Sequence, residues 1–277
     1  MKALLLLTVL LAPLAAHDSD HHWQVEDQET IHHSYAGGAG HKLVVDNFAG
    51  AIHVTGGGGQ IEVTLVRHNR ADSAEKLAEA KREIKLAITE QSGEVKLKQD
   101  GPWSRNHGDY HGDRDGYRVE FDYDIQVPVG TALALENFNS EIALKGTSGD
   151  FDLHSFNGHI EAEDVTGAGN VHTFNGPVKI GFRRNPEHDL NVKTFNGAVD
   201  VYFQRGLSAD LSYKTFNGGV FSDFEMLPVA SRAGAGGNGT KYVYHSGRAG
   251  SGRIGQGGPK LAFEGFNGAI RLHEAKP

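Results

Sequence analysis

Apolar and polar residues alternate in short runs through the second half of the chain, and these runs recur around one motif. The motif is a phenylalanine followed by asparagine and, in most copies, glycine; its phenylalanines are Phe138, Phe156, Phe174, Phe195, Phe216 and Phe266. An earlier copy at Phe48 has alanine in place of the asparagine. The successive spacings are 18, 18, 21 and 21 residues, followed by a longer gap to the last copy. This periodicity indicates a repeat architecture.

Each copy predicts two strands joined by a tight turn. The residues five and three positions before the phenylalanine are apolar, as are those four and six positions after it, with Gly169 and Ser222 as exceptions. Alternation with period two on both sides of an Asn-Gly step is typical of strand, turn, strand. Only one face of each strand is apolar, so a single copy cannot bury its own core.

Two arrangements of the copies fit this pattern. Asn-Gly steps are a hairpin signal, and consecutive hairpins would build a meander. A parallel β-solenoid with coils of 18–21 residues explains better why identical residues occur at every turn, because stacked coils place equivalent residues about 4.8 Å apart. We therefore expect an all-β parallel solenoid with glycine at its corners, where a positive φ is needed. Its repeated columns comprise Phe138, Asn139, Phe156, Asn157, Gly158, Phe174, Asn175, Gly176, Phe195, Asn196, Gly197, Phe216, Asn217, Gly218, Phe266, Asn267 and Gly268.

The region before the repeats predicts one helix among several strands. Residues 72–83 have Asp72 or Ser73 as a cap, acidic residues early and basic residues late, as the helix dipole favours. Strand-like runs cover residues 61–66, 84–89, 94–98 and 117–129. We expect residues 41–128 to cap one end of the solenoid and residues 129–277 to form the repeats, with a glycine-rich loop at 226–260.

The start of the chain has the layout of an export signal. Residues 1–16 carry one lysine, an apolar run and small residues at the end, which is typical of a cleaved signal peptide. Residues 17–40 then form a polar segment rich in histidine. It could scavenge zinc, copper or nickel, or it could be a solvated tail without fixed ligand spacing. No second hydrophobic segment follows, so we expect an exported protein, periplasmic, secreted or on the cell surface, with no integral membrane segment after cleavage.

Composition excludes several classes of function. The 277 residues contain no cysteine, which removes disulfide scaffolds, thiol nucleophiles and iron–sulfur clusters. The formal net charge is −8 and no basic run occurs, so a nucleic-acid partner is not expected. The 37 glycines accompany enough apolar residues for a sizeable core.

Candidate metal ligands fall in two places. The position two residues before each phenylalanine forms an outward column in which His154 and His172 lie one coil apart. The loop containing Asp109, Asp113 and Asp115 partly matches a calcium loop but lacks its full spacing. An exposed polar column and an ordinary loop are the respective alternatives. The acidic residues of the outward columns are expected to be isolated from basic neighbours, which argues against chemistry on an acidic glycan.

Two irregular segments are candidates for contacting a partner. Residues 182–189 lengthen one repeat and contain Arg183 and Arg184, and the glycine-rich loop contains further aromatic and basic side chains. Arginine and aromatic residues on loops are typical of interaction surfaces, although a solvated loop is also compatible. The loop residues concerned are Tyr242, Tyr244, Arg248 and Arg253.

The repeated strand-turn-strand copies, the helix inserted after the first copy and the closing run at residues 252–272 resemble the bacterial putative-adhesin family, a β-solenoid domain of unknown function. The resemblance covers roughly residues 41–277. It implies an envelope or surface role and supplies no catalytic residues. Phenylalanine before Asn-Gly departs from the small or polar residues of that family, which predicts a bulkier core or a stacked aromatic column.

Together these features favour a non-enzymatic, exported interaction scaffold without a cofactor, whose partner is an envelope protein or a glycan. Two alternatives remain open from the sequence: a carbohydrate-binding or carbohydrate-active solenoid, and a periplasmic metal-binding protein that uses its histidine-rich start.

Overall fold

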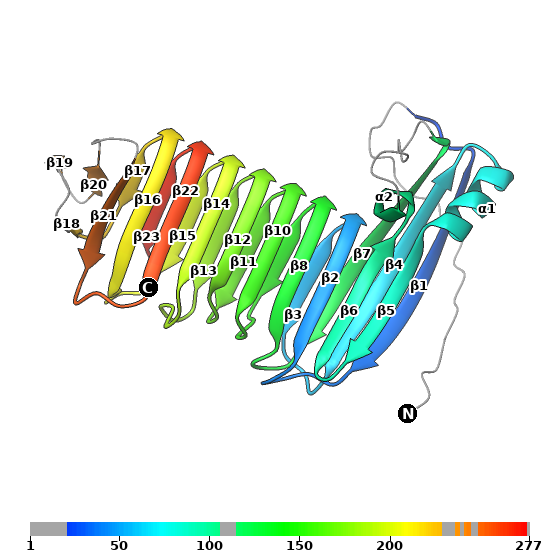
Figure 1. The fold of residues 1–277 in the computed structure, drawn as a ribbon, viewed down its shortest axis with the longest axis horizontal. Coiled ribbons are helices and arrows are strands. Elements are labelled where there is room, and N and C mark those ends of the chain that lie inside the picture. The colour runs from blue at the N-terminus through cyan, green and yellow to red at the C-terminus, as the bar shows by residue number, and fades with distance from the viewer. Residues whose placement is uncertain (1–20, 106–114, 229–235, 239–240, 245–248, 276–277) are drawn as a thin grey trace.

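The computed structural model describes residues 21–105, 115–228, 236–238, 241–244 and 249–275 (Figure 1). Within these residues the protein is all-β, as predicted, and its strands form two large mixed sheets. The order in the twelve-stranded sheet is β1-β4-β7-β3-β9-β11-β13-β15-β23-β17-β20-β19, and in the eleven-stranded sheet it is β18-β21-β16-β22-β14-β12-β10-β8-β2-β6-β5.

The elements before the repeats are β1 (Val25–Tyr35), β2 (Lys42–Ala49), β3 (Ile52–Gly56), β4 (Ile61–Ala71), α1 (Ala74–Glu83), β5 (Lys85–Gln91), β6 (Glu94–Asp100), α2 (Pro102–Arg105) and β7 (Tyr117–Val127). The repeats comprise β8 (Ala132–Asn139), β9 (Ile142–Lys145), β10 (Phe151–Asn157), β11 (Ile160–Val165), β12 (Gly169–Asn175), β13 (Val178–Phe182), β14 (Leu190–Asn196), β15 (Val199–Phe203), β16 (Ala209–Asn217) and β17 (Val220–Ser222). The last segment contains β18 (Leu227–Pro228), β19 (Gly236–Asn238), β20 (Lys241–Tyr244), β21 (Ala249–Ile254), β22 (Lys260–Asn267) and β23 (Ile270–Glu274).

Each repeat contributes one strand to each sheet, and equivalent strands pair in parallel. In the eleven-stranded sheet β10 pairs with β12 and β12 with β14, so that Asn157 is opposite Asn175 and Asn175 is opposite Asn196. In the other sheet β11, β13 and β15 pair in the same way. Neighbouring strands are therefore offset by one repeat of the sequence.

The last repeat departs from chain order. Its strands β22 and β23 lie between β14/β15 and β16/β17, so Leu261 is opposite both Leu190 and Leu211 (Figure 1). After β14 and β15 the chain leaves one strand position in each sheet open and forms β16 and β17 beyond it. It then continues through β18–β21 and returns, so that β22 and β23 occupy the open positions. Strand β21 pairs antiparallel with β16 on its outer side.

The predicted apolar positions form the core between the two sheets. In the repeat around Phe156, the side chains of Phe151, Leu153, Ile160 and Ala162 are buried, and equivalent positions are buried in the other repeats except at Gly169. The residue directly before each phenylalanine is also buried, and it is polar in every copy except the last, which has Gly265 there. In β12, the buried Thr173 hydroxyl donates to the carbonyl oxygen of Gly158 in the preceding repeat at 2.9 Å.

The glycines at the turns are explained by the close approach of neighbouring turns. The sequence suggested a positive φ as the reason for them. A Cβ atom on Gly197 would lie 2.1 Å from the carbonyl oxygen of Gly176, and one on Gly176 would lie 2.3 Å from that of Gly158. A positive φ is present at Gly50, Gly176 and Gly268 but not at Gly158, Gly197 or Gly218. The need for space is therefore what these corner glycines share.

The elements before the repeats extend both sheets at one end of the molecule (Figure 1). Helix α1 matches the prediction, and its cap is Ser73, whose hydroxyl accepts from the Lys76 N–H at 3.2 Å. The helix packs mainly against β4 and β7. The histidine-rich segment, considered above as a solvated tail, instead contains β1, which pairs antiparallel with β4 over its full length.

Candidate interaction surface

A column of phenylalanine rings follows the outer face of the eleven-stranded sheet. We call it the aromatic column; in spatial order it comprises Phe48, Phe138, Phe156, Phe174, Phe195, Phe266 and Phe216. Consecutive ring centroids are 4.6–5.2 Å apart and the ring planes are within 7° of parallel. Trp103 of α2 stacks on Phe48 at 4.1 Å and extends the column by one ring.

The rings are outside the core. Phe138, Phe156, Phe174, Phe195, Phe216 and Phe266 are each 37–44% exposed, which is unusual for side chains of this size. The stacked column expected from the sequence is therefore present, and the bulkier core is not. The alternation of side chains along a strand could have predicted this outward position. The residues five and three positions before each phenylalanine point inward, so the phenylalanine itself must point outward.

A ladder of side-chain amides lies beside the aromatic column at the turns. The Nδ2 atom of Asn175 donates to Oδ1 of Asn157 at 2.9 Å, and Nδ2 of Asn196 donates to Oδ1 of Asn175 at 2.8 Å. The same bond joins Asn157 to Asn139, Asn267 to Asn196 and Asn217 to Asn267. The ladder holds successive turns, and therefore successive rings, in register.

A second column on the same face carries the ionisable groups. We call it the ion column; in spatial order it comprises Lys98, Asp46, Glu136, His154, His172, Lys193, Glu264 and Lys214. The predicted proximity of His154 and His172 is confirmed, with ring centroids 5.8 Å apart. Asp152 Oδ1 lies 2.9 Å from His154 Nε2.

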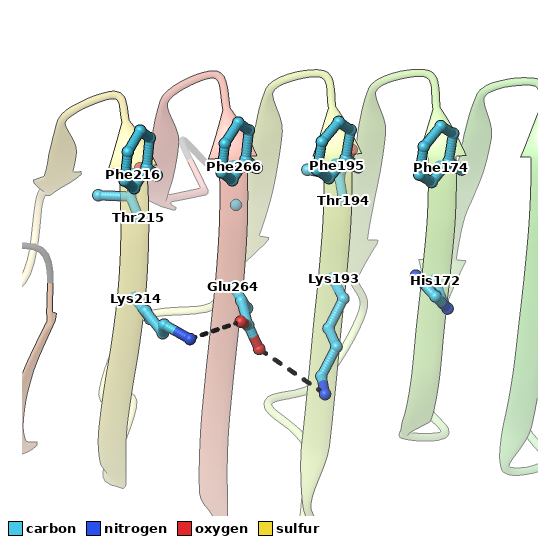
Figure 2. A pocket seen from close by; sticks show the side chains of 11 residues that line it. His172, Phe174, Lys193, Thr194, Phe195, Lys214, Thr215, Phe216, Glu264 and Phe266 are labelled. Carbon is cyan, nitrogen blue, oxygen red and sulfur yellow. Dashed lines mark hydrogen bonds and ion pairs between the residues drawn. The ribbon is translucent and has the colours of Figure 1, made fainter.

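The expectation that acidic residues are isolated in this column is wrong. Glu264 lies between two lysines, 3.1 Å from Lys214 Nζ and 3.7 Å from Lys193 Nζ (Figure 2). The cause is the inserted last repeat, which brings Glu264 between residues that are consecutive copies in the sequence. The sequence does not show this strand order directly, because 50 residues separate Phe216 from Phe266. The opposite charges of Glu264 and the two lysines are the sequence feature that could have indicated it.

Two adjoining hollows lie along this face, between the aromatic column and the ion column. One has a volume of about 570 Å³ and includes Lys193, Phe195 and Glu264; the other, of about 840 Å³, includes Phe48, Glu136 and Phe138. Both are lined in part by His172 and Phe174. The two hollows thus form one shallow groove with an aromatic wall and an ionisable wall, as seen for one half of it in Figure 2.

The electrostatics of the groove change along its length. Acidic Asp46 and Glu136 lie toward one end, two histidines occupy the middle, and the lysines flank Glu264 toward the other end. Partial burial lowers the pKa of His172, and nearby His154 and Lys193 lower it further. The uncharged form of His172 is therefore favoured in the folded chain.

The arginines selected from the sequence do not meet in one place. Arg183 follows β13 of the twelve-stranded sheet, where its guanidinium contacts the Asp164 carboxylate at 3.1 Å and Arg184 is exposed beside it. Arg253 belongs to β21 of the other sheet and donates to Asp210 at 2.9 Å. The backbone of Tyr242 and Tyr244 lies in β20, and Arg248 is outside the described residues.

No group of three or more histidine, aspartate or glutamate side chains suited to holding a metal ion occurs among the residues that the structure describes. His154 and His172 are neighbours, and the carboxylate of Asp152 contacts His154. On the other side of the turn, Glu141 lies between His53 and His159, at 2.6 and 3.2 Å. Of the loop aspartates, Asp109 and Asp113 fall outside the described part, which includes Asp115.

No helix in the described ranges is long and apolar enough to cross a membrane. No protein-family model and no curated protein matches the chain. Solved structures similar to it include a putative cell adhesion protein from Clostridium sporogenes, with 14% identity, a TM-score of 0.39, and coverage of 90% of this chain and 100% of the other. A putative adhesin from Bacteroides fragilis has 10% identity and a TM-score of 0.39 over 89% of this chain and 97% of its own.

A putative lipid binding protein from Parabacteroides distasonis has 9% identity and a TM-score of 0.24, covering 90% of this chain and 97% of the other. Two of these three structures have adhesin-like names, at 14% and 10% identity. The function of the chain has to be argued from its own residues.

Proposed function

We propose that the protein is an exported, non-enzymatic interaction scaffold of the cell envelope, in which stacked repeats form a parallel β-solenoid that presents the aromatic column and the ion column as one binding face. Parallel pairing at an offset of one repeat supports the solenoid. The single observation that carries the binding role is the exposed row of phenylalanines, because soluble proteins rarely expose contiguous apolar surface without a partner for it.

The orientation of the rings bears on the class of partner. Along the column the rings lie face to face, so their edges, rather than their faces, are presented to solvent. A sugar ring stacks on an aromatic face, and these faces are occupied by neighbouring rings. An extended surface that covers the ring edges and offers charges to the ion column fits better, which favours an envelope protein over a glycan.

The chemistry of the groove supports binding more than catalysis. A carboxylate that acts as a general acid or base must be free to exchange a proton with a bound substrate. Glu264 is instead between two lysines on an open face, where its role is to pair with them.

Binding of envelope material to the intact chain tests this proposal. A variant with Phe156→Ser, Phe174→Ser and Phe195→Ser removes the middle of the aromatic column and should lose at least about 90% of the binding measured by sedimentation with envelope fractions. The matched control is Lys179→Ser on the outer face of the other sheet, which should bind like the parent chain.

Equal binding by the triple variant and the parent chain would contradict the proposed face. A glycan array with analysis of products examines the enzymatic alternative, and turnover of any polysaccharide would overturn the non-enzymatic assignment. Mass spectrometry with zinc or copper, comparing the parent chain with one lacking residues 17–41, examines metal binding by the histidine-rich start.

A further inference from the structure

The binding face is self-complementary when two copies meet face to face. We propose that the partner of this face is a second copy of the same chain, bound in a symmetric dimer about a two-fold axis that lies parallel to the strands and passes by His154. This inference rests on the proposed function, since it names the occupant of the same face. A two-fold interface requires a surface that matches itself in reversed order, and the ion column has this property.

The two-fold axis reverses the order of the strands. The ion column of one chain then faces the ion column of the other, and the aromatic columns face each other in the same way. With His154 on the axis, Glu136 faces His172 of the second copy, and Asp46 faces Lys193 of the second copy. One strand further out, Lys98 faces Glu264. Each of these contacts joins an acidic group to a basic group or to an imidazole N–H, so the ion column favours this register.

Neighbouring registers lack this match. If the axis moves by half the spacing between strands, it lies between His154 and His172. Asp46 is then opposite Glu264, and Lys98 is opposite Lys214. Moving it to His172 places Glu136 opposite Glu264. Like charges held opposite one another cost affinity, so the sequence of charges selects one register out of three.

The aromatic column meets its own copy in the same arrangement. Phe156 lies on the axis beside its counterpart, Phe138 faces Phe174, and Phe48 faces Phe195. The ring edges that water now contacts would pack against ring edges of the second copy, and face-to-face packing of sheets with aligned strands is a standard arrangement.

The size of the face is sufficient for a stable dimer. In this register seven strands overlap: β6, β2, β8, β10, β12, β14 and β22. Strands about 4.8 Å apart and roughly 23 Å long cover on the order of 800 Å² per copy, which is the usual size for a specific interface.

Charge reversal tests the register. We expect the whole chain to sediment as a dimer that weakens as salt increases. Lys193→Glu and Asp46→Lys should each raise the dissociation constant about tenfold or more, and the double variant should restore the dimer because the swapped charges attract again. Lys179→Glu, on the outer face of the other sheet, is the control of equal charge change and should leave the dimer intact.

The absence of cysteine permits a second measurement. His154→Cys should cross-link to its own copy with a bis-maleimide of roughly 10 Å span, the separation of two packed sheets, whereas Lys179→Cys should not. A chain that is monomeric at every concentration, a dimer indifferent to both single reversals, or equal cross-linking at residues 154 and 179 would each overturn the inference. Envelope binding by a monomeric chain would overturn the dimer and leave the proposed function standing.

Discussion

Asn267 donates a side-chain hydrogen bond of 2.7 Å to Asn196, a residue 71 positions earlier in the chain. The next copy of the motif after Asn196 is Asn217, which lies one strand further away and bonds to Asn267 instead. The last repeat is therefore an internal element of the fold, and the strands on either side of it cannot complete their pairing until the chain has returned.

Removal of residues 260–277 should consequently disrupt the fold more than the loss of a terminal repeat. Strand β22 pairs on both sides, and its Leu261 and Phe263 are buried. We expect the shortened chain to lose its cooperative unfolding transition in denaturant, and a peptide of residues 259–277 to restore it. A peptide of the same composition in scrambled order is the control, and a sharp transition in the shortened chain alone would contradict the prediction.

Gly197→Ala should destabilise the chain by about 2 kcal/mol or more, because a methyl group there would overlap the carbonyl oxygen of Gly176 and force the neighbouring turns apart. The matched control is Gly59→Ala, since a Cβ atom at Gly59 meets no other atom within 4 Å. That variant should remain within about 0.5 kcal/mol of the parent chain. Urea titration measures both free energies of unfolding, and equal effects would refute the explanation by close approach.

Asn175→Ala should cost about 1–2 kcal/mol, because it removes the amide that bonds to both Asn157 and Asn196. Asn217→Ala, at the end of the ladder, removes a single bond to Asn267 and should cost about half as much. Comparable losses at the two positions in chemical denaturation would show that the ladder does not contribute bond by bond.

Stability should decrease as the pH falls below about 6.5. Burial, His154 and Lys193 lower the pKa of His172, so in this range the unfolded chain binds more protons than the folded chain, and its proton uptake favours unfolding. Burial also lowers the pKa of His33, which acts in the same direction. His172→Asn should therefore reduce, but not abolish, the difference between unfolding free energies measured at pH 7.5 and pH 5.5. If His172→Asn leaves this difference in unfolding free energy unchanged, other groups cause the pH dependence.

Much of the repeat region could be predicted from the sequence, because alternation with period two and a fixed spacing are local properties. The inward positions, helix α1 with its Ser73 cap, and the proximity of His154 to His172 all follow from local patterns. The outward position of the phenylalanines followed from the same alternation, yet their size and apolar character also suggested a place in the core.

Other features depend on the tertiary arrangement. Strand β1 has a mostly polar sequence whose pairing with β4 no local pattern reveals. The contacts of Glu264 with Lys193 and Lys214 arise from the order in which strands are placed, which chain order does not determine. The groove and its self-complementary charges could be described only once that order was known.

The asparagine ladder also gives the molecule an electrical direction. All of its described bonds run the same way, with each Nδ2 group pointing toward the Asn139 end and each Oδ1 atom toward the Asn217 end. An amide dipole is roughly 3.5 D, and aligned amides add and polarise one another as they do along a helix. The row of turns therefore carries partial positive charge at Asn139 and partial negative charge at Asn217, so an anion is favoured at the first end and a cation at the second.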